Sequence, residues 1–353
     1  MSVEEEIKKL EEEIKNTPYN KATEHHIGKL KAKLARLREE VKRSKSPKGH
    51  GFFVKKSGDA SVAIIGPPSV GKSTLLNALT NAESRIGEYD FTTTQIIPGI
   101  MEYEGCNIQL LDLPGIIYGA SQGRGRGREI IAMARMVDLI LIMIDVFSIG
   151  EVERIRKELW DAGIRINRRK PDVIIRKKDR GGINIEFAKK CRLSYETAKT
   201  ISLEYMSNAD IVIRDDIDIE EFIDAILGNR VYLPAFLVVN KIDVKDVNFS
   251  SDMDTVFISA KNGYNIEDLK KKIFEKLELI RVYMKPEGKK IEDKPMVLKK
   301  KATIKDVCKK LHRDFVKNFR YAIIEGPSAS FPKQRVGLNH EVKDGDVITI
   351  VTH

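Results

Sequence analysis

A glycine-rich stretch early in the chain carries the residue types that bind the phosphates of a nucleotide. It reads Gly66-Pro67-Pro68-Ser69-Val70-Gly71-Lys72-Ser73 and is followed by Thr74. In a loop with this spacing the backbone N–H groups surround the α- and β-phosphates, the lysine reaches the β- and γ-phosphates, and the serine hydroxyl binds Mg²⁺. The stretch therefore predicts a phosphate-binding loop in which Lys72 also serves catalysis.

Two later segments have the residues that respond to a γ-phosphate. The first contains Phe91-Thr92-Thr93-Thr94, and a GTPase needs a threonine in such a switch to close on Mg²⁺ and the γ-phosphate. Three adjacent threonines leave the register of this switch open. The second is Asp112-Leu113-Pro114-Gly115, in which the carboxylate would support Mg²⁺ through a water and the glycine N–H would bind the γ-phosphate.

Two further motifs have the chemistry of a guanine reader. In Asn240-Lys241-Ile242-Asp243, the aspartate would accept hydrogen bonds from the N1–H and N2–H₂ groups of guanine, which adenine does not offer. Asn240 would fix the loop and the stem of Lys241 would stack over the base. The backbone of Ser259-Ala260-Lys261 would contact the guanine O6. These motifs follow the phosphate loop and the switches in the order that a GTPase domain requires.

The elements that must position these motifs are short apolar strands. Apolar runs at residues 61–65, 108–111, 235–239 and 256–258 each end at one of the motifs, and residues 137–145 form a further buried run. Continuous β-branched runs are typical of parallel strands that are buried on both faces. The pattern predicts an α/β P-loop GTPase fold with a doubly wound, mostly parallel sheet and the ligand at the carboxyl ends of the strands.

Composition and charge limit the class of protein. The 353 residues exceed the size of one ordinary core, so two or more domains are expected. A hydrophobic content of 42% and a charged content of 32% indicate a globular rather than a disordered chain. The formal charge of +10 points to an acidic partner such as nucleic acid, the ribosome or an anionic membrane, although a solvated lysine-rich surface gives the same number.

The cysteines and the apolar runs favour a cytoplasmic protein. Cys106, Cys191 and Cys308 lie far apart and form no C-x-x-C pair, so neither a disulfide framework nor a zinc site is expected. The longest apolar run, residues 137–147, is too short to span a bilayer and contains two aspartates. The chain begins with an acidic helix rather than a secretion signal, and we expect no membrane partner.

Residues 1–49 are predicted to form a helical hairpin and a polar linker. Apolar residues recur at helical spacing from residue 3, Asn16-Thr17-Pro18 interrupts them, and a second helix is expected at about residues 23–41. The second helix has lysines and arginines on its polar face. It is either a strut that packs on a neighbouring domain or a basic helix that contacts RNA.

Residues 164–231 are too many for one crossover and predict an inserted α+β domain, which splits the G domain into residues 50–163 and 232–285. Strands at residues 171–176 and 182–185 flank a basic turn, as in a β-hairpin, and helices are expected at residues 195–206 and 219–227 with a strand at residues 211–213. The densest basic cluster of the chain lies here and is either an RNA contact or a solvated loop: Arg165, Arg168, Arg169, Lys170, Arg176, Lys177, Lys178 and Arg180.

Residues 286–353 are predicted to form a compact C-terminal domain. A lysine-rich helix at residues 265–282 is expected before it, and residues 285–290 interrupt that helix. Strands are expected at residues 296–298, 321–324, 334–336 and 347–351, with a helix that opens at residues 303–307. This alternation predicts a ubiquitin-like β-grasp, and the domain carries no catalytic constellation, which favours a docking module.

With these motifs in place, the chain resembles the Obg-related GTPases and, more narrowly, the developmentally regulated GTP-binding protein family of archaea and eukaryotes. The segments that carry the resemblance are residues 20–34, 66–73, 89–93, 112–116 and 178–184. The resemblance covers essentially the whole chain. It implies an N-terminal helix-turn-helix segment, a G domain interrupted by an inserted domain, and a C-terminal TGS domain. It also implies association with translating ribosomes and a regulatory partner protein. We expect rRNA to be a partner and the protein to be a monomer.

The resemblance also bears on the reaction. It makes Thr93 the Mg²⁺ ligand of the first switch. Where Ras-like enzymes place a glutamine that orients water, this chain has Ile116, so hydrolysis of GTP is expected to be slow, on the order of 10⁻⁴ to 10⁻² s⁻¹. Some relatives bind K⁺ through an asparagine of the phosphate loop, but Ser69 stands at that position here, which weakens the expectation of a K⁺ site.

Two classes of function remain open from the sequence. The first is a Mg²⁺-dependent switch that hydrolyses GTP to GDP and phosphate and is read by the translation machinery. The alternative is a ribosome- or RNA-binding scaffold in which GTP is mainly structural. A GTPase of the membrane surface is weaker, because the chain has no lipidation motif and no basic amphipathic anchor with aromatic residues.

Overall fold

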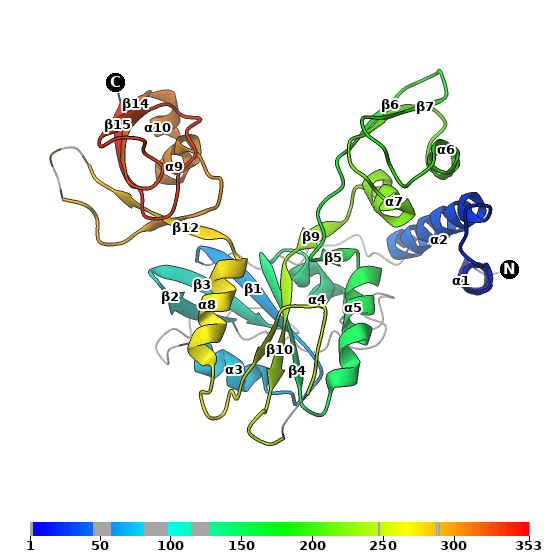
Figure 1. The fold of residues 1–353 in the computed structure, drawn as a ribbon, viewed down its shortest axis with the longest axis horizontal. Helices are drawn as coiled ribbons and strands as arrows, with labels where there is room; N and C mark the ends of the chain where they lie inside the picture. Colours follow the sequence, from blue (N-terminus) through cyan, green and yellow to red (C-terminus); the bar gives the residue numbers. More distant parts are fainter. Residues whose placement is uncertain are drawn as a thin grey trace. The chain divides into compact units, whose positions relative to one another are not determined.

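The computed structural model describes residues 3–44, 58–80, 98–113, 127–245, 248–286, 288 and 290–352, without the side chains of 42–44 and 127–129. The chain divides into two compact units, most of whose helices and strands are labelled in Figure 1. Unit 1 contains the N-terminal helices and residues 158–233. Unit 2 contains the predicted GTPase motifs and the C-terminal domain. Each unit is described by itself.

A six-stranded sheet forms the centre of unit 2. Its strands are β1 (Ala60–Ile65), β2 (Pro98–Tyr103), β3 (Cys106–Asp112), β4 (Leu139–Asp145), β10 (Ala235–Asn240) and β11 (Thr255–Phe257). Their order is β11-β10-β4-β1-β3-β2, and every pair is parallel except the edge pair of β2 and β3. This order confirms the predicted doubly wound, mostly parallel sheet.

The central strands are fully buried because they are apolar on both faces. Every residue of β1, β4 and β10 is buried, as the continuous β-branched runs predict. Helices α3 (Lys72–Leu79) and α8 (Ile266–Lys276) pack against one face, where Leu75 and Leu269 join the same apolar core as Val62 and Val238. In chain order the sheet also connects to α4 (Gly127–Ala134), the 3₁₀ turn η2 (Ile149–Glu151) and α5 (Val152–Asp161).

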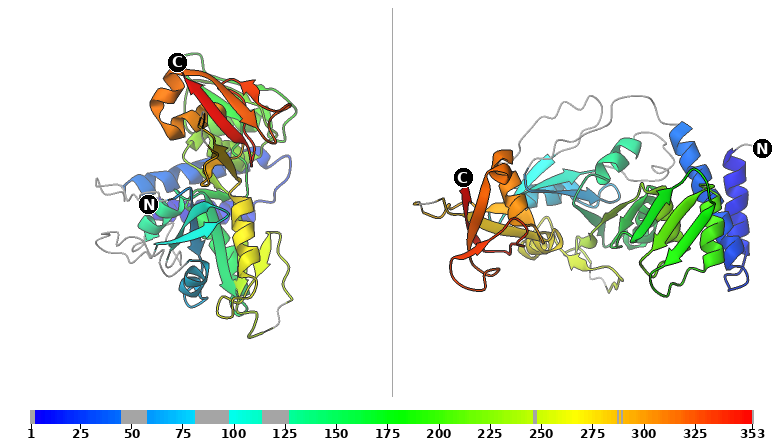
Figure 2. Two further views of the ribbon diagram at one scale, coloured as in Figure 1. Left: turned by 90° about the vertical axis from the view of Figure 1, so that its left-hand side faces the viewer. Right: turned by 90° about the horizontal axis from the view of Figure 1, so that it is seen from above.

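A five-stranded sheet forms the C-terminal part of unit 2. It contains β12 (Leu279–Met284), β13 (Met296–Lys299), β14 (Phe319–Glu325), β15 (Gln334–Val336) and β16 (Val347–Thr352), in the order β13-β12-β16-β14-β15. The helices α9 (Ile304–Leu311) and α10 (Arg313–Lys317) lie on one side of this sheet (Figure 2). Val307 and Cys308 of α9 pack on Ala322, Ile324 and Ile348, as expected for a β-grasp.

The predicted lysine-rich helix at residues 265–282 is too long. Helix α8 ends at Lys276, and Glu278 has a positive φ of 49°, which a continuing helix does not allow. The next residues alternate between buried and half-exposed positions in β12, so they favour a strand. The C-terminal sheet therefore begins at Leu279, ahead of the predicted boundary at residue 286.

Unit 1 combines a helical hairpin with a small sheet. The helices α1 (Val3–Asn16) and α2 (Glu24–Ser44) pack through Leu10, Leu30 and Leu37, as the apolar spacing predicts. The small sheet contains β6 (Val173–Lys177), β7 (Ile183–Phe187) and β8 (Ala209–Ile213), with helices α6 (Tyr195–Leu203) and α7 (Ile219–Leu227). Strands β5 (Ile164–Ile166) and β9 (Val231–Leu233) pair as a separate parallel ladder.

The predicted hairpin of the inserted domain is wrong in its pairing. Strands β6 and β7 do not pair with each other, because β8 lies between them, antiparallel to β6 and parallel to β7. Ile211 and Ile213 of β8 are buried in the core of this domain, and a central position satisfies the backbone groups on both edges of such a buried strand. The short turn that joins β6 to β7 in the sequence therefore does not make these two strands neighbours in the sheet.

The basic cluster of the inserted domain is only partly available for RNA. Arg165 is 4% exposed and its guanidinium binds both carboxylate oxygens of Asp224, at 2.5 and 2.8 Å. Lys178 forms an ion pair with Asp210. The guanidinium of Arg168 lies 4.8 Å from the ring centre of Trp160. Burial removes Arg165 from the predicted contact surface, whereas Lys178 is partly exposed and Arg168 is exposed.

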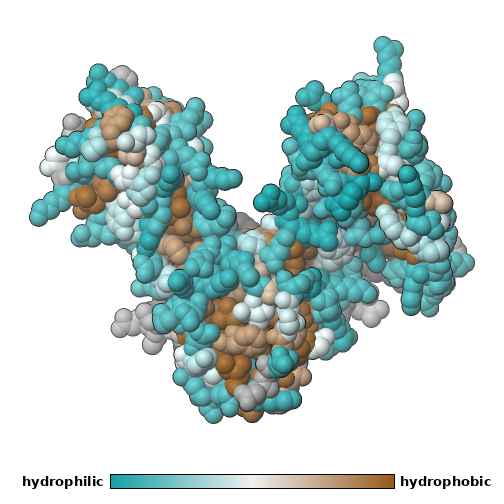
Figure 3. All heavy atoms as spheres, viewed as in Figure 1, coloured by the Kyte–Doolittle hydropathy of each residue, from teal (hydrophilic) through white to brown (hydrophobic). Residues whose placement is uncertain are grey.

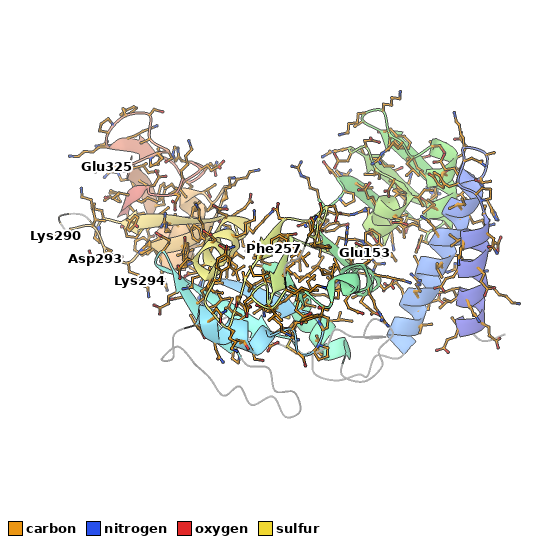
Figure 4. The ribbon with its side chains drawn as sticks, turned by 60° about the horizontal axis from the view of Figure 1, so that its bottom comes forward. Glu153, Phe257, Lys290, Asp293, Lys294 and Glu325 are labelled. Carbon is orange, nitrogen blue, oxygen red and sulfur yellow. The ribbon has the colours of Figure 1, made fainter. Side chains whose placement is uncertain are left out.

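None of the described helices is both long enough and apolar enough to cross a bilayer. Figure 3 shows hydrophilic residues over most of the visible face, and hydrophobic residues gather over the β10–β11 edge of the six-stranded sheet. Phe257, labelled in Figure 4, ends this edge strand and is half-buried.

Candidate functional site

The loop between β1 and α3 is closely packed and depends on its glycines. Gly71 has a φ of 98° and directly precedes α3. A Cβ added at Gly66 would stand 1.9 Å from the carbonyl oxygen of Met143, and one at Gly71 would stand 2.5 Å from Nδ2 of Asn240. The loop therefore has room for backbone only, so its N–H groups and the first turn of α3 can approach an anion closely.

Lys72 is buried inside this loop. Its Nζ donates hydrogen bonds to the carbonyl oxygens of Gly66, at 3.1 Å, and Pro67, at 2.8 Å. Burial lowers the pKa of the ammonium, while the nearby carboxylate of Asp112 acts in the opposite direction. Within the described residues the hydrogen bonds of this buried cation go to neutral carbonyls, so an anionic partner such as a phosphate group in the loop would stabilise it.

Ser73 and Asp112 meet at the carboxyl end of β3. The Ser73 hydroxyl donates to Oδ2 of Asp112 at 2.9 Å, and Oδ1 of the same carboxylate is buried and has no hydrogen-bond partner among the described residues. An unpaired buried carboxylate oxygen is costly, so this atom is suited to a cation or to a water bound to that cation. Mg²⁺ prefers oxygen ligands and takes one or two from protein beside those of a phosphate, so these two residues fit the ion.

Among the described residues, no group of three or more histidine, cysteine, aspartate or glutamate side chains is arranged to hold a metal. A protein-only metal cage is therefore not found in these parts of the chain. The site is one that a cation would share with a phosphate.

Asn240 joins the predicted guanine reader to the phosphate loop. Its Nδ2 donates to the carbonyl of Val70 at 2.8 Å, and its Oδ1 accepts from the backbone N–H of Ala260 at 2.9 Å. The residue is 3% exposed. One buried amide thus ties together three loops that are far apart in the sequence, as predicted for a residue that fixes the geometry. The backbone N–H of Ala260, which belongs to the segment predicted to contact the guanine O6, donates to Asn240 in this structure.

Lys241 lies beside the phosphate loop in a strained backbone conformation. Its φ is 63°, which is uncommon for a residue with a side chain. Its Nζ donates to the carbonyl of Ser69 at 2.8 Å and to Oδ2 of Asp145 at 2.6 Å. The backbone conformation fixes one end of the Lys241 side chain and the two hydrogen bonds of Nζ fix the other. The aliphatic stem is therefore rigid enough to support a flat base.

Asp145 is the residue of this site that sequence reasoning missed. Its Oδ1 accepts from the N–H of Phe147 at 3.1 Å and the hydroxyl of Ser148 at 2.7 Å, which leaves Oδ2 for Lys241. Burial alone raises the pKa of Asp145, but the hydrogen bonds from Lys241, Ser148 and Phe147 outweigh it and hold the pKa below its usual value. The signal in the sequence is that Asp145 is the last residue of a buried apolar strand. In the sheet it lies beside Asn240, its register partner in the neighbouring strand.

Asp243 and the loop after β11 complete the described part of the site. Asp243 is exposed, in a turn closed by a hydrogen bond from the N–H of Val244 to the carbonyl of Lys241 at 3.0 Å. Ser259 is buried, and its hydroxyl accepts from the N–H of Asn262 at 3.3 Å. The carboxylate is thus presented at the surface by a fixed loop, where a base can reach it.

Several predicted residues stand elsewhere or outside the described parts. Phe91, Thr92, Thr93, Pro114 and Gly115 lie outside the described residues, so the two switch predictions stay predictions. Leu113 is described and buried, with its N–H bonded to the carbonyl of Ile64 at 3.2 Å. Ile242 is held by a bond from its N–H to the carbonyl of Ile258 at 3.4 Å. Six predicted residues are exposed: Pro68, Ser69, Ser73, Thr74, Asp243 and Lys261.

The fold and the site together define a P-loop GTPase. The family described as 50S ribosome-binding GTPase matches residues 61–178, the C-terminal region of that domain matches residues 180–279, and a TGS domain matches residues 280–352. The last match begins within one residue of strand β12, in agreement with the C-terminal sheet.

Full-length relatives identify the family. A GTP-binding protein of Methanocaldococcus jannaschii, itself uncharacterized, is 52% identical over 364 residues, which cover 99% of this chain and 93% of that protein. Developmentally-regulated GTP-binding protein 2 of Homo sapiens is 44% identical over 365 residues, covering 99% of this chain and 100% of the human protein. Developmentally-regulated G-protein 3 of Arabidopsis thaliana is 44% identical over 364 residues, covering 99% of each chain. The chain belongs to the developmentally-regulated GTP-binding protein family and is a GTP-binding protein.

Proposed function

We propose that this protein hydrolyses GTP to GDP and phosphate with Mg²⁺ and uses its two nucleotide states as a slow molecular switch. The observation that carries the proposal is the pair of Ser73 and Asp112. A hydroxyl in the first turn of α3 faces a carboxylate whose second oxygen is buried and has no partner in the described parts of the chain, beside a buried lysine. This donor set suits a cation shared with the β- and γ-phosphates.

Each residue of the site then has a defined task. The loop amides and Lys72 bind the phosphates and stabilise the charge that develops as the γ-phosphate leaves. Ser73 and Asp112 would hold Mg²⁺, which supplies charge neutralisation on the phosphates. Asn240 holds the loops together, Lys241 supports the base, and Asp243 selects guanine. Because Ile116 stands where a water-orienting glutamine is found in Ras-like enzymes, we expect intrinsic turnover on the order of 10⁻⁴ to 10⁻² s⁻¹.

The cellular setting is part of the same proposal. The matched G-domain family is described as ribosome-binding, and the net charge of +10 suits a large RNA partner. We place the switch on the ribosome in the cytoplasm, together with a regulatory protein that stabilises it. Ser69 in place of an asparagine makes dependence on K⁺ a question for experiment, and rates in K⁺ and Na⁺ buffers answer it.

Phosphate release from GTP tests the enzymatic part. The wild type should turn over many equivalents of GTP in Mg²⁺, and EDTA should abolish the reaction. Ser73→Ala should lower the rate by at least tenfold, while Ser84→Ala, in the same segment of sequence but outside the motifs, should leave it unchanged. A single equivalent of phosphate with no further turnover would favour the alternative, a scaffold with structural GTP.

Base selection tests the guanine assignment separately. Asp243→Asn should weaken the binding of GTP and favour xanthosine nucleotides, because the new amide donates to the O2 of xanthine. Isothermal titration with GTP and with xanthosine triphosphate measures both. Unchanged affinity for GTP would show that Asp243 does not read the base.

Sedimentation with ribosomes tests the setting. The full chain, loaded with GDP or with a non-hydrolysable GTP analogue, is pelleted with ribosomes over a salt series. Binding that depends on the nucleotide and survives moderate salt supports a switch directed at the ribosome. Equal binding in both states that disappears with salt would reflect only a basic protein meeting RNA.

A further inference from the structure

The β2–β3 hairpin runs from the nucleotide site to the C-terminal domain. It forms one edge of the six-stranded sheet, and β2 pairs with β3 along its whole length (Figure 1). At one end, β3 finishes at Asp112, whose carboxylate accepts a hydrogen bond from the Ser73 hydroxyl at 2.9 Å. The 7 residues of β3 span about 20 Å, so the turn of the hairpin lies at the opposite edge of the sheet.

The turn of the hairpin contains a residue type that its backbone does not favour. Glu104 and Gly105 have φ values of 51° and 77°, and they lie between the paired residues Tyr103 and Cys106. Two positive φ values define a type I′ turn, for which Asn-Gly is a preferred pair. A glutamate in the left-handed region is uncommon, which indicates that its side chain serves a contact outside the turn.

That contact is with Arg281 of the C-terminal sheet. Nη1 of Arg281 donates to the carboxylate of Glu104 at 2.7 Å, while Nη2 and Nε donate to Asp344 at 2.8 and 3.1 Å. The guanidinium carbon lies 5.5 Å from the centre of the Phe274 ring, which is 5.7 Å from the ring centre of Tyr103. One side chain therefore connects the hairpin turn to β12, to the loop before β16 and to α8.

Apolar packing joins the hairpin and the C-terminal sheet at the same place. Leu279 of β12 and Val297 of β13 are buried in the apolar core of the six-stranded sheet, together with Cys106 of the hairpin. A Cβ added at Gly105 would stand 2.9 Å from Cγ of Pro295, so the turn lies directly against the residue that precedes β13. The contact between the hairpin and this sheet is thus both apolar and ionic.

Two further ion pairs attach the C-terminal domain to the same edge. Asp59, just before β1, accepts from the N–H of Asn107 on β3 at 3.0 Å and from Nζ of Lys310 on α9 at 3.3 Å. Nζ of Lys299 on β13 donates to Asp138, just before β4, at 2.7 Å. The C-terminal domain therefore holds the edge at which the parallel strands begin, and the nucleotide motifs lie where these strands end.

Within this sheet the hairpin has the most freedom to shift. Strands β1 and β4 are paired on both sides and buried along their whole length, whereas β2 is an edge strand of the described sheet and is only partly buried. Loss of a γ-phosphate changes the charge beside Asp112, and packed segments respond to such a change by discrete shifts. Two paired strands move as one body, so a shift at Asp112 reaches Arg281.

We propose that the β2–β3 hairpin couples the nucleotide state of the G domain to the C-terminal domain through the contact between Glu104 and Arg281. Arg281 is a positioning residue, because it acts through the hairpin on Asp112 and so on the affinity for Mg²⁺. Linkage makes the effect reciprocal, so a partner that binds the C-terminal domain in one nucleotide state changes the nucleotide affinity by the same factor. This proposal rests on the GTPase proposed above and names how its site is regulated.

An asparagine at position 104 tests the link without weakening the turn. Because Asn-Gly suits a type I′ turn, Glu104→Asn should keep or raise the stability of the hairpin while it removes the contact with Arg281. The Mg²⁺ concentration that gives half-maximal GTP hydrolysis by the full chain should rise at least threefold. Arg281→Gln should give the same shift, and the double variant should add less than twofold to either single change, because both remove one interaction.

The matched control is an ion pair within the C-terminal domain itself. Nζ of Lys285 lies 3.5 Å from the carboxylate of Glu325, which is labelled in Figure 4 at the end of β14. Lys285→Gln also removes one positive charge from this domain, but it should change the Mg²⁺ dependence less than 1.5-fold. Urea unfolding of each variant checks that the fold is kept.

Hydrogen exchange measures the coupling directly. The full chain is loaded with GDP or with a non-hydrolysable GTP analogue, and the exchange of backbone amides in β12 and β13 is compared. The two states of the wild type should differ at these strands, and this difference should fall at least threefold in Glu104→Asn. An ion pair with only a structural role would change exchange equally in both states.

Three outcomes would overturn the proposal. One is a wild type in which β12 and β13 exchange equally in the two nucleotide states. Another is an unchanged Mg²⁺ dependence in both Glu104→Asn and Arg281→Gln. The third is an equal shift in Lys285→Gln, which would reflect the loss of charge rather than the hairpin. Turnover of GTP by the wild type is measured in the same assay, so failure of the coupling and failure of the proposed function give different results.

Discussion

The basic residues of α2 and two arginines of the C-terminal sheet meet different partners. Along α2, Lys31 pairs with Glu220 at 2.7 Å, Lys33 with Glu6 at 2.7 Å, and Arg38 with Glu11 at 2.7 Å. Arg36 donates to the carbonyl of Glu204 at 3.1 Å. In the C-terminal sheet, by contrast, Arg320 and Arg335 contact only the ring of Tyr321 among the described contacts.

This difference shows that a positive charge count does not identify a nucleic-acid surface. The two regions are similarly basic in sequence, yet the cations of α2 hold helices of unit 1 together, whereas Arg320 and Arg335 form no ion pair with a described residue. Of the two predictions for α2, a strut or an RNA-binding helix, the structure favours the strut. The predictions below test whether paired cations are structural and unpaired ones functional, from the largest expected effect to the smallest.

The most deeply paired cations should be the most structural. Asp224→Ala leaves Arg165 and Arg230 without their shared carboxylate, and these arginine side chains are 4% and 10% exposed. Removing one member of a buried ionic network costs about 3–5 kcal/mol, so urea unfolding of the full chain should show a destabilisation of this size in unit 1. The control Asp210→Asn, at a partly exposed pair with Lys178, should cost under about 1 kcal/mol. Equal costs for the two variants would contradict the structural role.

A paired cation of the nucleotide site should affect ligand binding instead. Asp145→Asn removes the charged partner of Lys241, and a hydrogen bond to a charged group contributes about 1.5–3 kcal/mol. Affinity for GDP and for GTP should fall by about tenfold or more, measured by titration calorimetry. Ser148→Ala removes a neutral bond to the same carboxylate and should have a smaller effect. If the binding of both nucleotides is unchanged, Lys241 is held by Ser69 alone.

The surface arginines should separate stability from RNA binding. Arg36→Gln, Arg38→Gln should lower the free energy of unfolding by about 1 kcal/mol, because both arginines bind acidic partners or a carbonyl on neighbouring elements. Arg320→Gln, Arg335→Gln should change it by less than about 0.5 kcal/mol. Chemical unfolding of both double variants, read beside their affinities for ribosomal RNA in the sedimentation assay, makes the comparison. If the double variant at Arg320 and Arg335 loses stability but keeps its affinity for RNA, these two arginines are structural rather than functional.

The smallest expected effect is the loss of an ion pair in the C-terminal domain, and the stability that this pair contributes depends on pH. Arg281 binds Asp344 at 2.8 Å, and this contact lowers the pKa of the aspartate. Because the pKa of Asp344 is lower in the folded state, the ionised carboxylate stabilises the fold at pH values above its unfolded pKa of about 3.9. This stabilisation is lost as the pH falls through the folded pKa. Asp344→Asn should therefore lower the melting temperature slightly at pH 7, and the difference should shrink below about pH 4. The pair is partly exposed, so about a few tenths of a kcal/mol are expected.

The nucleotide loops were the most predictable part of the molecule. Their function needs particular residue types at short spacings, as in Gly66 to Ser73 and Asn240 to Asp243, so the motif is contained in a few consecutive residues. The strands that carry them were also predictable, because burial on both faces requires continuous apolar runs. Asp145 was missed because its role depends on its register partner Asn240, almost a hundred residues away.

The errors of the sequence analysis occurred where local pattern and tertiary pairing differ. The turn between residues 177 and 183 predicted a hairpin, but β8 pairs with both of its flanking strands. The predicted helix extended to residue 282, but residues 279–282 pair with β13, and residues 283–284 of the same strand pair with β16. In both cases the free energy of burying a central strand exceeds the local preference for a turn or a helix.

By itself the sequence determined the order of the motifs, the chemistry of the phosphate and guanine loops and the succession of domains. These depend on residue types and on periodicity, which are local properties. Only the tertiary structure decided which strands pair, how Asn240 joins three loops, and which arginines are paired. An ion pair such as that of Lys31 and Glu220 forms between residues far apart in the chain, so its presence, and the absence of a partner for Arg335 in the described residues, follows from the fold alone.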